Sequence, residues 1–418
     1  MSEEKFLDDL FSEEIERFIE RHAEDDASSL RLKYAGDKLM SAAILQIELR
    51  KKFARKFSAL VLSDNRVEEE ISLMPARFPS ALSAEQATAA SIARYHSSFA
   101  VPGSSLLDMT MGIGIDSAAF VCFKNCKVIG IERNKELAGY SRRNYAKVGD
   151  LEITCADSID WLGSTDRKFD MIFIDPARRD TAGNRVYNLH DCTPDITEIL
   201  PLIYEHTDNL LVKLSPMLDV KATLMDLPGC VALKAVESVG ECRELLAVCR
   251  RDACEADPEQ ITISAVDADG AYPEFKFSRS EESEAEVRYR QPHVGDILFE
   301  PSAAAMKAGG FKTPIGRFNL YKLHPNTHLY VSSVDELTAN YTDFPGKRYE
   351  ITAVLPFSSG ELKRFARTWG NASVSVRNFP MSAEKLRAKL GCRESSEQRL
   401  IAVTTADGSR AMLLVRSW

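Results

Sequence analysis

The stretch "LLDMTMGIGIDSAAF", residues 106–120, joins a short apolar run to a helical pattern through a glycine-containing loop. An apolar run reaches an acid, Asp108, and then passes through Gly112 and Gly114 into a helical pattern. Glycines at these positions let the backbone approach a ligand closely, and the helix that follows offers free N–H groups. Because ordinary tight turns use the same residues, this stretch alone indicates a nucleotide-type ligand only weakly.

Short apolar runs continue after this stretch and alternate with helical segments. Several of them are too uniformly apolar to have one buried and one exposed face, which is typical of parallel strands in a sheet covered on both sides. We therefore expect an α/β fold with seven strands. They lie in "SLLDM" (105–109), "KVIGIE" (127–132), "EITCAD" (152–157), "FDMIFID" (169–175), "NLLVKLS" (209–215), "VALKAVES" (231–238) and "ELLAVCR" (244–250).

Polar side chains follow the second, third and fourth of these runs. Glu132 lies 18 residues past Gly114, about where an acid accepts hydrogen bonds from both hydroxyls of a ribose. Asp157 and Ser158 follow the third strand and suit the exocyclic amine of an adenine. The fourth strand ends in "FIDPARRD" (173–180), which places a carboxylate, a proline and two arginines at one strand end.

A nicotinamide dinucleotide fits this pattern poorly. Its fingerprint, G-x-G-x-x-G, requires a third small turn residue where this chain has Ser117. Asp108 would also face a pyrophosphate in a poorly solvated cleft, where two negative groups repel each other. Acids after the first three strands suit a cationic ligand without phosphate, and S-adenosylmethionine is such a ligand.

The segments "DMTMGIGID", "GIERN", "CADS" and "FIDPARR" resemble, in order and spacing, the motifs of class I S-adenosylmethionine-dependent methyltransferases. The resemblance covers about residues 86–251 and implies a Rossmann-like, seven-stranded core. Thr110 stands where many such enzymes have glycine, a variation also familiar among RNA methyltransferases. The cofactor-binding positions that it implies are Asp108, Thr110, Gly112, Gly114, Asp116, Glu132, Arg133, Asp157 and Ser158.

The wider chain resembles a bacterial family of methyltransferases that carry a C-terminal THUMP-like domain. We expect an N-terminal helical domain (1–97), a methyltransferase domain (98–251), a small α+β, ferredoxin-like domain (252–338) and a THUMP-like domain (339–418). The last domain has the predicted order β-α-β-α-β-β. The second resemblance rests on "SAEQATAASIARYH", "LHDCTPDI", "VKLSPMLD", "FEPSAAAMKAGGF", "RYEITAVLPFSSGELK" and "VRNFPMSAEKLRAKLG".

Three helical segments are predicted before the first strand, and one of them, "AAILQIELRKKFARKFSALVL" (42–62), is basic on its outer face. In "LDDLFSEEIERFIERH" (7–22), the apolar residues fall on one stripe with no Pro or Gly to interrupt it. The stretch "AEQATAASIARYHSSF" (84–99) predicts one further helix, with Ser83 and Gln86 at the spacing of a capping box.

The end of the fourth strand holds the candidate catalytic residues Asp175, Pro176, Ala177 and Arg178. In amino-group methyltransferases, the corresponding motif is an Asp or Asn, two prolines and an aromatic residue. Its acid and its first proline carbonyl accept hydrogen bonds from the target amino group and hold it before the methyl group. Ala177 replaces the second proline and Arg178 the aromatic residue, which would stack on a flipped base.

The candidate substrate-binding residues are Arg178, Arg179, Lys213 and Ser215. The two arginines suit either phosphate binding or ion pairs with neighbouring aspartates, and Lys213 is otherwise a strand-end charge. The strand end is also similar to the D-P-P-R motif of 5-methyluridine methyltransferases. Those enzymes need a cysteine nucleophile where this chain has Ser215, so that interpretation ranks low. His190 is a further candidate base.

Composition indicates a globular protein, with 44% hydrophobic and 28% charged residues. No segment has the apolar length of a membrane span, and the acidic start is unlike a secretory signal, so we expect a cytoplasmic location. The nine cysteines are scattered without paired C-x-x-C spacings, which favours buried thiols over a metal site.

Charge is distributed unevenly along the chain, whose net charge is -9. Residues 344–418 contain 13 Lys or Arg and 6 Asp or Glu, a balance of +7, which leaves the rest at -16. THUMP-type domains are associated with RNA binding in tRNA-modifying enzymes, so the resemblance implies a tRNA or rRNA partner.

The first hypothesis is therefore a methyltransferase that modifies a nucleobase of tRNA or rRNA. The acidity of the whole chain favours an alternative, a methyltransferase acting on a protein or a small molecule. A third hypothesis is a non-catalytic protein that binds S-adenosylmethionine or RNA. A dehydrogenase ranks last.

Overall fold

The computed structural model describes residues 2–57, 76–177, 189–255, 257–396 and 398–418. It contains two compact units. The first comprises Met1–Val231 and Glu244–Ala256, and the second comprises Ala232–Arg243 and Asp257–Trp418. Within the described ranges, no helix combines the length and apolar composition that crossing a bilayer requires.

The first unit begins with helices α1 (Glu3–Leu10), α2 (Glu13–Arg21), α3 (Ala27–Lys33), α4 (Lys38–Lys52) and α5 (Ala54–Phe57). The apolar stripe over residues 7–22 forms two helices, because Ser12 starts a new one. Its hydroxyl accepts a hydrogen bond from the amide of Ile15 at 3.4 Å, which caps α2.

The prediction of one helix over residues 84–99 was wrong. The chain forms α6 (Ala81–Gln86) and α7 (Ala90–Ser97) instead. The capping box consists of Ser80 and Ser83, whose hydroxyls each accept a hydrogen bond from the other residue's amide, at 3.1 and 3.2 Å. The helix therefore starts earlier than predicted and ends before Thr88, which lies in the loop between α6 and α7.

All seven predicted strands form. They are β1 (Ser105–Asp108), β2 (Lys127–Ile131), β3 (Leu151–Thr154), β4 (Met171–Ile174), β5 (Asn209–Leu214), β6 (Cys230–Ser238) and β7 (Glu241–Arg250). In the first unit the order is β3-β2-β1-β4-β5-β7, in which the first five strands are parallel and β7 is antiparallel to β5.

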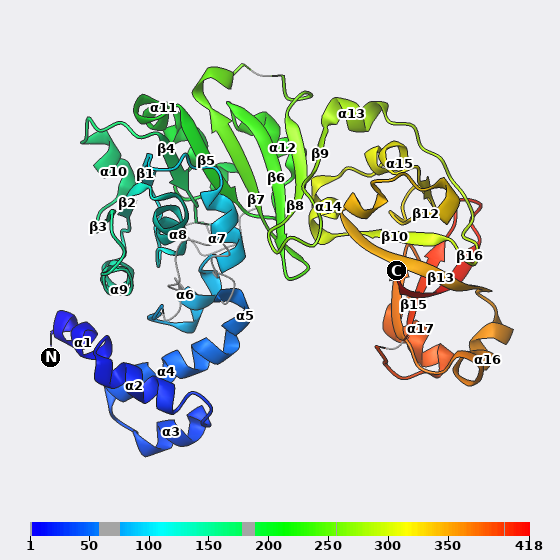
Figure 1. Ribbon diagram of the computed structural model, residues 1–418, viewed down its shortest axis with the longest axis horizontal. Coiled ribbons are helices and arrows are strands. Elements are labelled where there is room, and N and C mark those ends of the chain that lie inside the picture. Colours follow the sequence, from blue (N-terminus) through cyan, green and yellow to red (C-terminus); the bar gives the residue numbers. More distant parts are fainter. Residues whose placement is uncertain (1, 58–75, 178–188, 256, 397) are drawn as a thin grey trace. The chain divides into compact units, whose positions relative to one another are not determined.

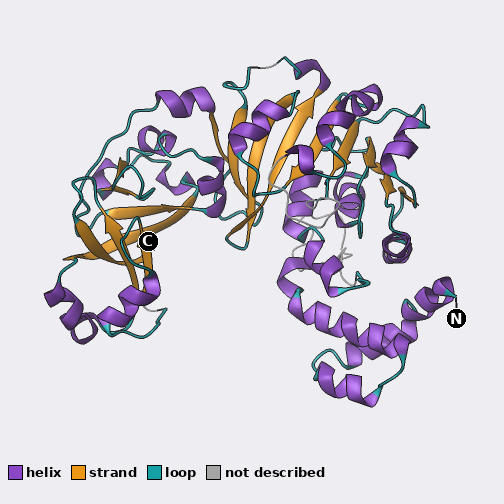
Figure 2. Ribbon diagram, turned by 180° about the vertical axis from the view of Figure 1, so that it is seen from behind, coloured by secondary structure: helices purple, strands orange, loops and turns teal. Residues whose placement is uncertain are grey.

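This strand order places a cleft between β1 and β4. The chain moves outward from β1 to β3 through α8 (Ile115–Lys124) and α9 (Lys135–Asn144), and returns through α10 (Ser158–Gly163) and α11 (Ile196–His206). Right-handed crossovers in opposite directions put the two helix pairs on opposite faces of the sheet, and Figure 2 shows helices flanking its strands. Ligands bind at the carboxyl ends of the strands where the direction reverses. The next helix is α12 (Val220–Asp226).

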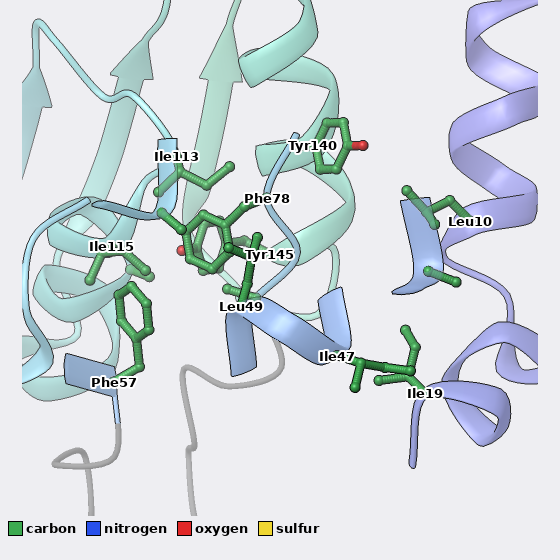
Figure 3. Packing of buried hydrophobic residues seen from close by; sticks show 14 of the residues in the cluster. Leu10, Ile19, Ile47, Leu49, Phe57, Phe78, Ile113, Ile115, Tyr140 and Tyr145 are labelled. Carbon is green, nitrogen blue, oxygen red and sulfur yellow. The ribbon is translucent and has the colours of Figure 1, made fainter. Parts of the chain in front are cut away.

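The N-terminal helices support the loop that follows β1. In Figure 1, α1 to α4 lie on the side of α6 and α9 that faces away from the strands. One hydrophobic cluster contains side chains of these helices together with Ile113 of the loop and Ile115, which begins α8. Figure 3 shows Leu49 and Phe78 beside Ile113 and Tyr145. The loop therefore rests on a packed apolar floor.

The second unit contains β8 (Thr262–Asp267), parallel to β6, and β9 (Phe275–Ser278). A separate sheet has the order β11-β12-β10-β13-β16-β15-β14. The predicted order of the last domain is found in β13, α16, β14, α17, β15 and β16. The bounds are α13 Arg279–Glu284, β10 Ile297–Pro301, α14 Ala303–Ala308, α15 Thr313–Arg317, β11 Tyr321–Lys322, β12 Tyr330–Ser332, β13 Gly346–Pro356, α16 Ser359–Trp369, β14 Ser373–Arg377, α17 Ala383–Leu390, β15 Arg399–Thr404 and β16 Arg410–Ser417.

Candidate functional site

A cavity of about 490 Å³ lies at the carboxyl ends of β1, β2, β3 and β4. Its size is that of a small-molecule site. Ten of the predicted residues line it: Thr110, Gly112, Gly114, Asp116, Glu132, Arg133, Asp157, Ser158, Asp175 and Ala177. Four others, Asp108, Pro176, Lys213 and Ser215, do not line it. Arg178 and Arg179 lie outside the described residues.

Two glycines shape the loop that forms the floor of the cavity. Gly112 and Gly114 have φ of 58° and 87°, in the left-handed region where a side chain is strained. A Cβ on Gly114 would overlap the methyl group of Met111 and the ring of Tyr145, whereas the space beside Gly112 is open. Close packing therefore requires glycine at 114, and the open space at 112 leaves the backbone accessible to a ligand.

Glu132 holds the loop after β1 and the turn after β2 together. Its carboxylate accepts a hydrogen bond from the amide of Gly112 at 2.9 Å and another from the amide of Asn134 at 2.6 Å. These two bonds fix the carboxylate at the wall of the cavity.

Asp157 caps the helix after β3. Its Oδ1 accepts hydrogen bonds from the amides of Ile159 and Asp160 at 2.9 and 3.3 Å. Capping orients the carboxylate at the start of α10, with Ser158 next to it in the cavity wall.

Asp108 is buried beneath the loop rather than exposed in the cavity. Its carboxylate accepts hydrogen bonds from the hydroxyl of Ser117 at 2.5 Å and from the amide of Thr110 at 3.1 Å. Burial raises the pKa of this carboxyl to about 7, and the charge of Asp116 raises it further, against the effect of the Ser117 hydrogen bond. Asp108 therefore changes charge near neutral pH.

Asp175 lies at the end of β4 with one oxygen already bonded. Its Oδ2 accepts a hydrogen bond from Nζ of Lys213 at 2.5 Å, and its amide donates to the hydroxyl of Thr110 at 2.6 Å. Its side chain is 28% exposed, while that of Lys213 is 6% exposed. Lys213, predicted to bind substrate, thus lies behind Asp175.

The segment after Asp175 is fixed by backbone pairing. The amide of Ala177 donates to the carbonyl of Thr193 at 2.7 Å, and the amide of Thr193 donates back at 3.2 Å. Thr193 and Pro194 thereby join the cavity wall.

Several residues of the site were not predicted from the sequence. Ser83, Gln86 and Thr88, from α6 and the loop after it, line the cavity. His96 on α7 is fully buried between two carboxylates, those of Asp116 and Glu244. No local pattern could have found this pair of contacts, because Glu244 is 148 residues away in the chain.

Two further candidate residues, Ser215 and His190, lie outside the cavity. Ser215 is buried, and its hydroxyl accepts from the amide of Met217 at 3.2 Å, a local turn contact. The side chain of His190 is 60% exposed, and its Nδ1 lies 3.1 Å from the hydroxyl of Thr197. Neither lines the cavity. Across the described residues, no cluster of His, Cys, Asp or Glu is arranged to hold a metal ion.

Comparison with family models and known proteins gives matches in both units. The family models match a ferredoxin-like domain over residues 298–345 and a THUMP domain-like family over residues 346–417. No curated protein matches the chain. A crystal structure from Porphyromonas gingivalis W83, described as a "putative methyltransferase", is 30% identical, with a TM-score of 0.82 over 100% of this chain and 99% of that chain.

Two further solved structures share only part of the fold. The first is an S-adenosylmethionine-dependent methyltransferase from Agrobacterium tumefaciens, 17% identical, with a TM-score of 0.23 over 30% of this chain and 42% of its own. The second is TrmN from Thermus thermophilus, 15% identical, with a TM-score of 0.33 over 40% and 51%.

Proposed function

Because the chain belongs to the same family as the Porphyromonas gingivalis protein, a family of class I methyltransferase fold with a THUMP-like C-terminal domain, we propose that it methylates a nucleobase of tRNA or rRNA. The methyl donor is S-adenosylmethionine. The observation that carries this proposal is one cavity at the strand reversal that brings together the glycine loop, the Glu132 carboxylate and Asp175.

The residues that line the cavity fit this donor. Glu132 would accept hydrogen bonds from the ribose hydroxyls, and Asp157 with Ser158 would meet the adenine amine. The open backbone at Gly112 lets the ligand approach closely, since nothing lies within 4 Å of the position of a Cβ. The carboxylates around the cavity favour a cation, and the donor supplies a methyl group activated on a positive sulfur.

Asp175 is the group that would hold the acceptor, since it lines the cavity, whereas Pro176, whose carbonyl was predicted to share this role, does not. A carboxylate accepts hydrogen bonds, so it would select a nitrogen that still carries hydrogen and orient its lone pair toward the methyl group. It would also stabilise the positive charge that develops on this nitrogen. The paired backbones of Ala177 and Thr193 keep the segment after β4 in place for this task.

An RNA acceptor is supported by the charge of the terminal domain. Four of its cations, Lys363, Arg367, Lys385 and Lys389, are exposed on α16 and α17. The structure gives none of these four side chains an ion pair among the described residues. Exposed cations without acidic partners attract a phosphate backbone, and their effect depends on salt.

The test is to incubate the protein with S-adenosylmethionine labelled in its methyl group and with total RNA, total protein or a metabolite extract. We expect label in RNA, and a nuclease digest should then recover it in a nucleoside. Label found only in protein or in metabolites would overturn the RNA assignment and support the alternative acceptors. The Asp175→Ala protein controls for label that binds without transfer.

A further inference from the structure

A row of buried charged side chains runs beneath the ends of β4 and β5. Its first part is centred on His96, which is fully buried. Nε2 of His96 lies 2.5 Å from Oε1 of Glu244, and Nδ1 lies 2.8 Å from Oδ1 of Asp116. The imidazole thus joins a carboxylate on β7 to a carboxylate on α8.

The second part connects Asp116 to Asp175. The hydroxyl of Thr88 donates to Oδ2 of Asp116 at 2.5 Å and accepts from Nζ of Lys213 at 3.1 Å. The same Nζ donates to Oδ2 of Asp175 at 2.5 Å. From Glu244 to Asp175, carboxylates alternate with basic side chains, and the hydroxyl of Thr88 bridges Asp116 and Lys213.

The charges of the row stabilise one another. Burial alone lowers the pKa of His96, but the charges and hydrogen bonds of Glu244 and Asp116 raise it to about 9, so the ring is an imidazolium at neutral pH. Burial likewise lowers the pKa of Lys213, and the charges of Asp175, Asp116 and Glu244 raise it above its usual range. The carboxylates of the row therefore favour the charged forms of His96 and Lys213.

Other groups around the row leave His96 and Lys213 as its cations. The ring of Phe173 lies 5.4 Å from that of His96 and brings no charge. Asp108 lies near enough to Asp116 for their charges to interact, and its own carboxyl titrates near pH 7. The position of Lys213 itself, 5% exposed and absent from the cavity wall, keeps it from reaching a phosphate of an acceptor.

We propose that Lys213 is a positioning residue, which the row beneath it holds in place, and that its ammonium fixes one oxygen of Asp175 so that the other is presented to the acceptor. This inference rests on the proposed function. It assigns to Lys213 and His96 a role through Asp175 and not through contact with the substrate.

The test compares Lys213→Arg, which keeps the cation, with Lys213→Met, which removes it. We expect Lys213→Met to lower kcat roughly 100-fold or more, because the acceptor is no longer oriented. The Kd for S-adenosylhomocysteine should stay within about threefold of wild type, because Lys213 does not line the cavity. Lys213→Arg should recover much of kcat. Equal kcat in Lys213→Met and wild type, or a parallel loss of kcat and cofactor affinity, would overturn the proposal.

Two measurements do not depend on activity. In crystals with S-adenosylhomocysteine, the Asp175 carboxylate should occupy one conformation in wild type and more than one in Lys213→Met. In ¹⁵N-histidine spectra, His96 should be protonated at pH 8 in wild type and neutral in Glu244→Gln. An ordered Asp175 in Lys213→Met, or a neutral His96 in wild type, contradicts the inference even if no acceptor is found.

Removal of a buried ammonium leaves carboxylates without their cation, so Lys213→Gln is measured alongside. It keeps a hydrogen-bond donor without the charge, on a side chain one bond shorter. We expect its kcat to fall between those of Lys213→Arg and Lys213→Met. A Lys213→Gln protein that folds and transfers as fast as wild type would show that no ammonium is needed at this position, which would overturn the proposal. Absence of any transfer by wild type would instead overturn the proposed function.

Discussion

The buried carboxyl of Asp108 should make ligand binding depend on pH. Its pKa of about 7 means that its negative charge appears as the pH rises from 6 to 8. A cationic ligand in the cavity above it is attracted more strongly by the ionised form. We expect the affinity for S-adenosylmethionine to increase roughly tenfold over this range, measured by calorimetry.

The matched variant is Asp108→Asn, which keeps a hydrogen-bonding side chain of the same shape but carries no charge. Its affinity should be the same at pH 6 and pH 8. If Asp108→Asn retains the full pH dependence, another group is responsible, and the electrostatic role of Asp108 is wrong.

Asp175 should affect transfer and not cofactor binding. We expect Asp175→Ala to lower kcat by roughly 100- to 10,000-fold, with little change in the Kd for S-adenosylhomocysteine, because its carboxylate orients the acceptor. Asp170→Ala is the control, since Asp170 lies at the opposite end of β4 and bonds Ser105 there. It should transfer at close to the wild-type rate. A parallel loss of binding and turnover in Asp175→Ala would show that Asp175 holds the donor.

The stability of the loop after β1 depends on the close packing of Gly114 against its neighbours. We expect Gly114→Ala to destabilise the first unit by about 1–3 kcal/mol, because it combines a left-handed φ with overlap against Met111 and Tyr145. The fluorescence of Trp161 reports urea unfolding of this unit, in a protein whose other two tryptophans, Trp369 and Trp418, are replaced by Phe.

Gly163→Ala is the control for this prediction. Gly163 ends α10, and no atom lies within 4 Å of the position of its Cβ. Alanine there should leave stability unchanged or raise it by up to about 1 kcal/mol. Equal effects of the two substitutions would show that the loop tolerates a side chain at 114.

Among the structural elements, the sequence predicts those whose signals come from adjacent residues. Strand patterns and the glycine loop are visible because burial and turn geometry act on adjacent residues, and all seven strands were confirmed. The start of α6 was misplaced, since Ser80 and Ser83 compete with Ser83 and Gln86 for the same capping geometry. The row from Glu244 to Asp175 joins residues far apart in the chain, so only the fold reveals it.

At the scale of the whole molecule, the uneven charge predicts a measurable dependence on salt. We expect the triple variant of Lys363, Lys385 and Lys389 to alanine to weaken RNA binding and to lower the slope of log affinity against log salt by about 2. The control replaces Lys5, Lys38 and Lys127, which are exposed in the first unit. An unchanged slope in the first variant would show that the terminal domain does not contact phosphates.

Part of the terminal charge is not available to RNA. Glu300 forms ion pairs with Arg377 at 2.7 Å and with Arg399 at 2.9 Å, and Arg416 pairs with Glu350 at 2.6 Å. The sequence count of +7 cannot distinguish these cations from the exposed lysines, because Glu300, which pairs with two of them, precedes the counted residues 344–418. Arg178 and Arg179 stay predictions as phosphate contacts.

We propose that this protein methylates RNA through Asp175. Mass spectrometry of nucleosides tests this, with RNA from cells that lack the gene and from cells complemented with wild type or with Asp175→Ala. We expect one methylated nucleoside to be absent without the gene, restored by wild type and not restored by Asp175→Ala. An identical set of methylated nucleosides in all of these cells would contradict the claim.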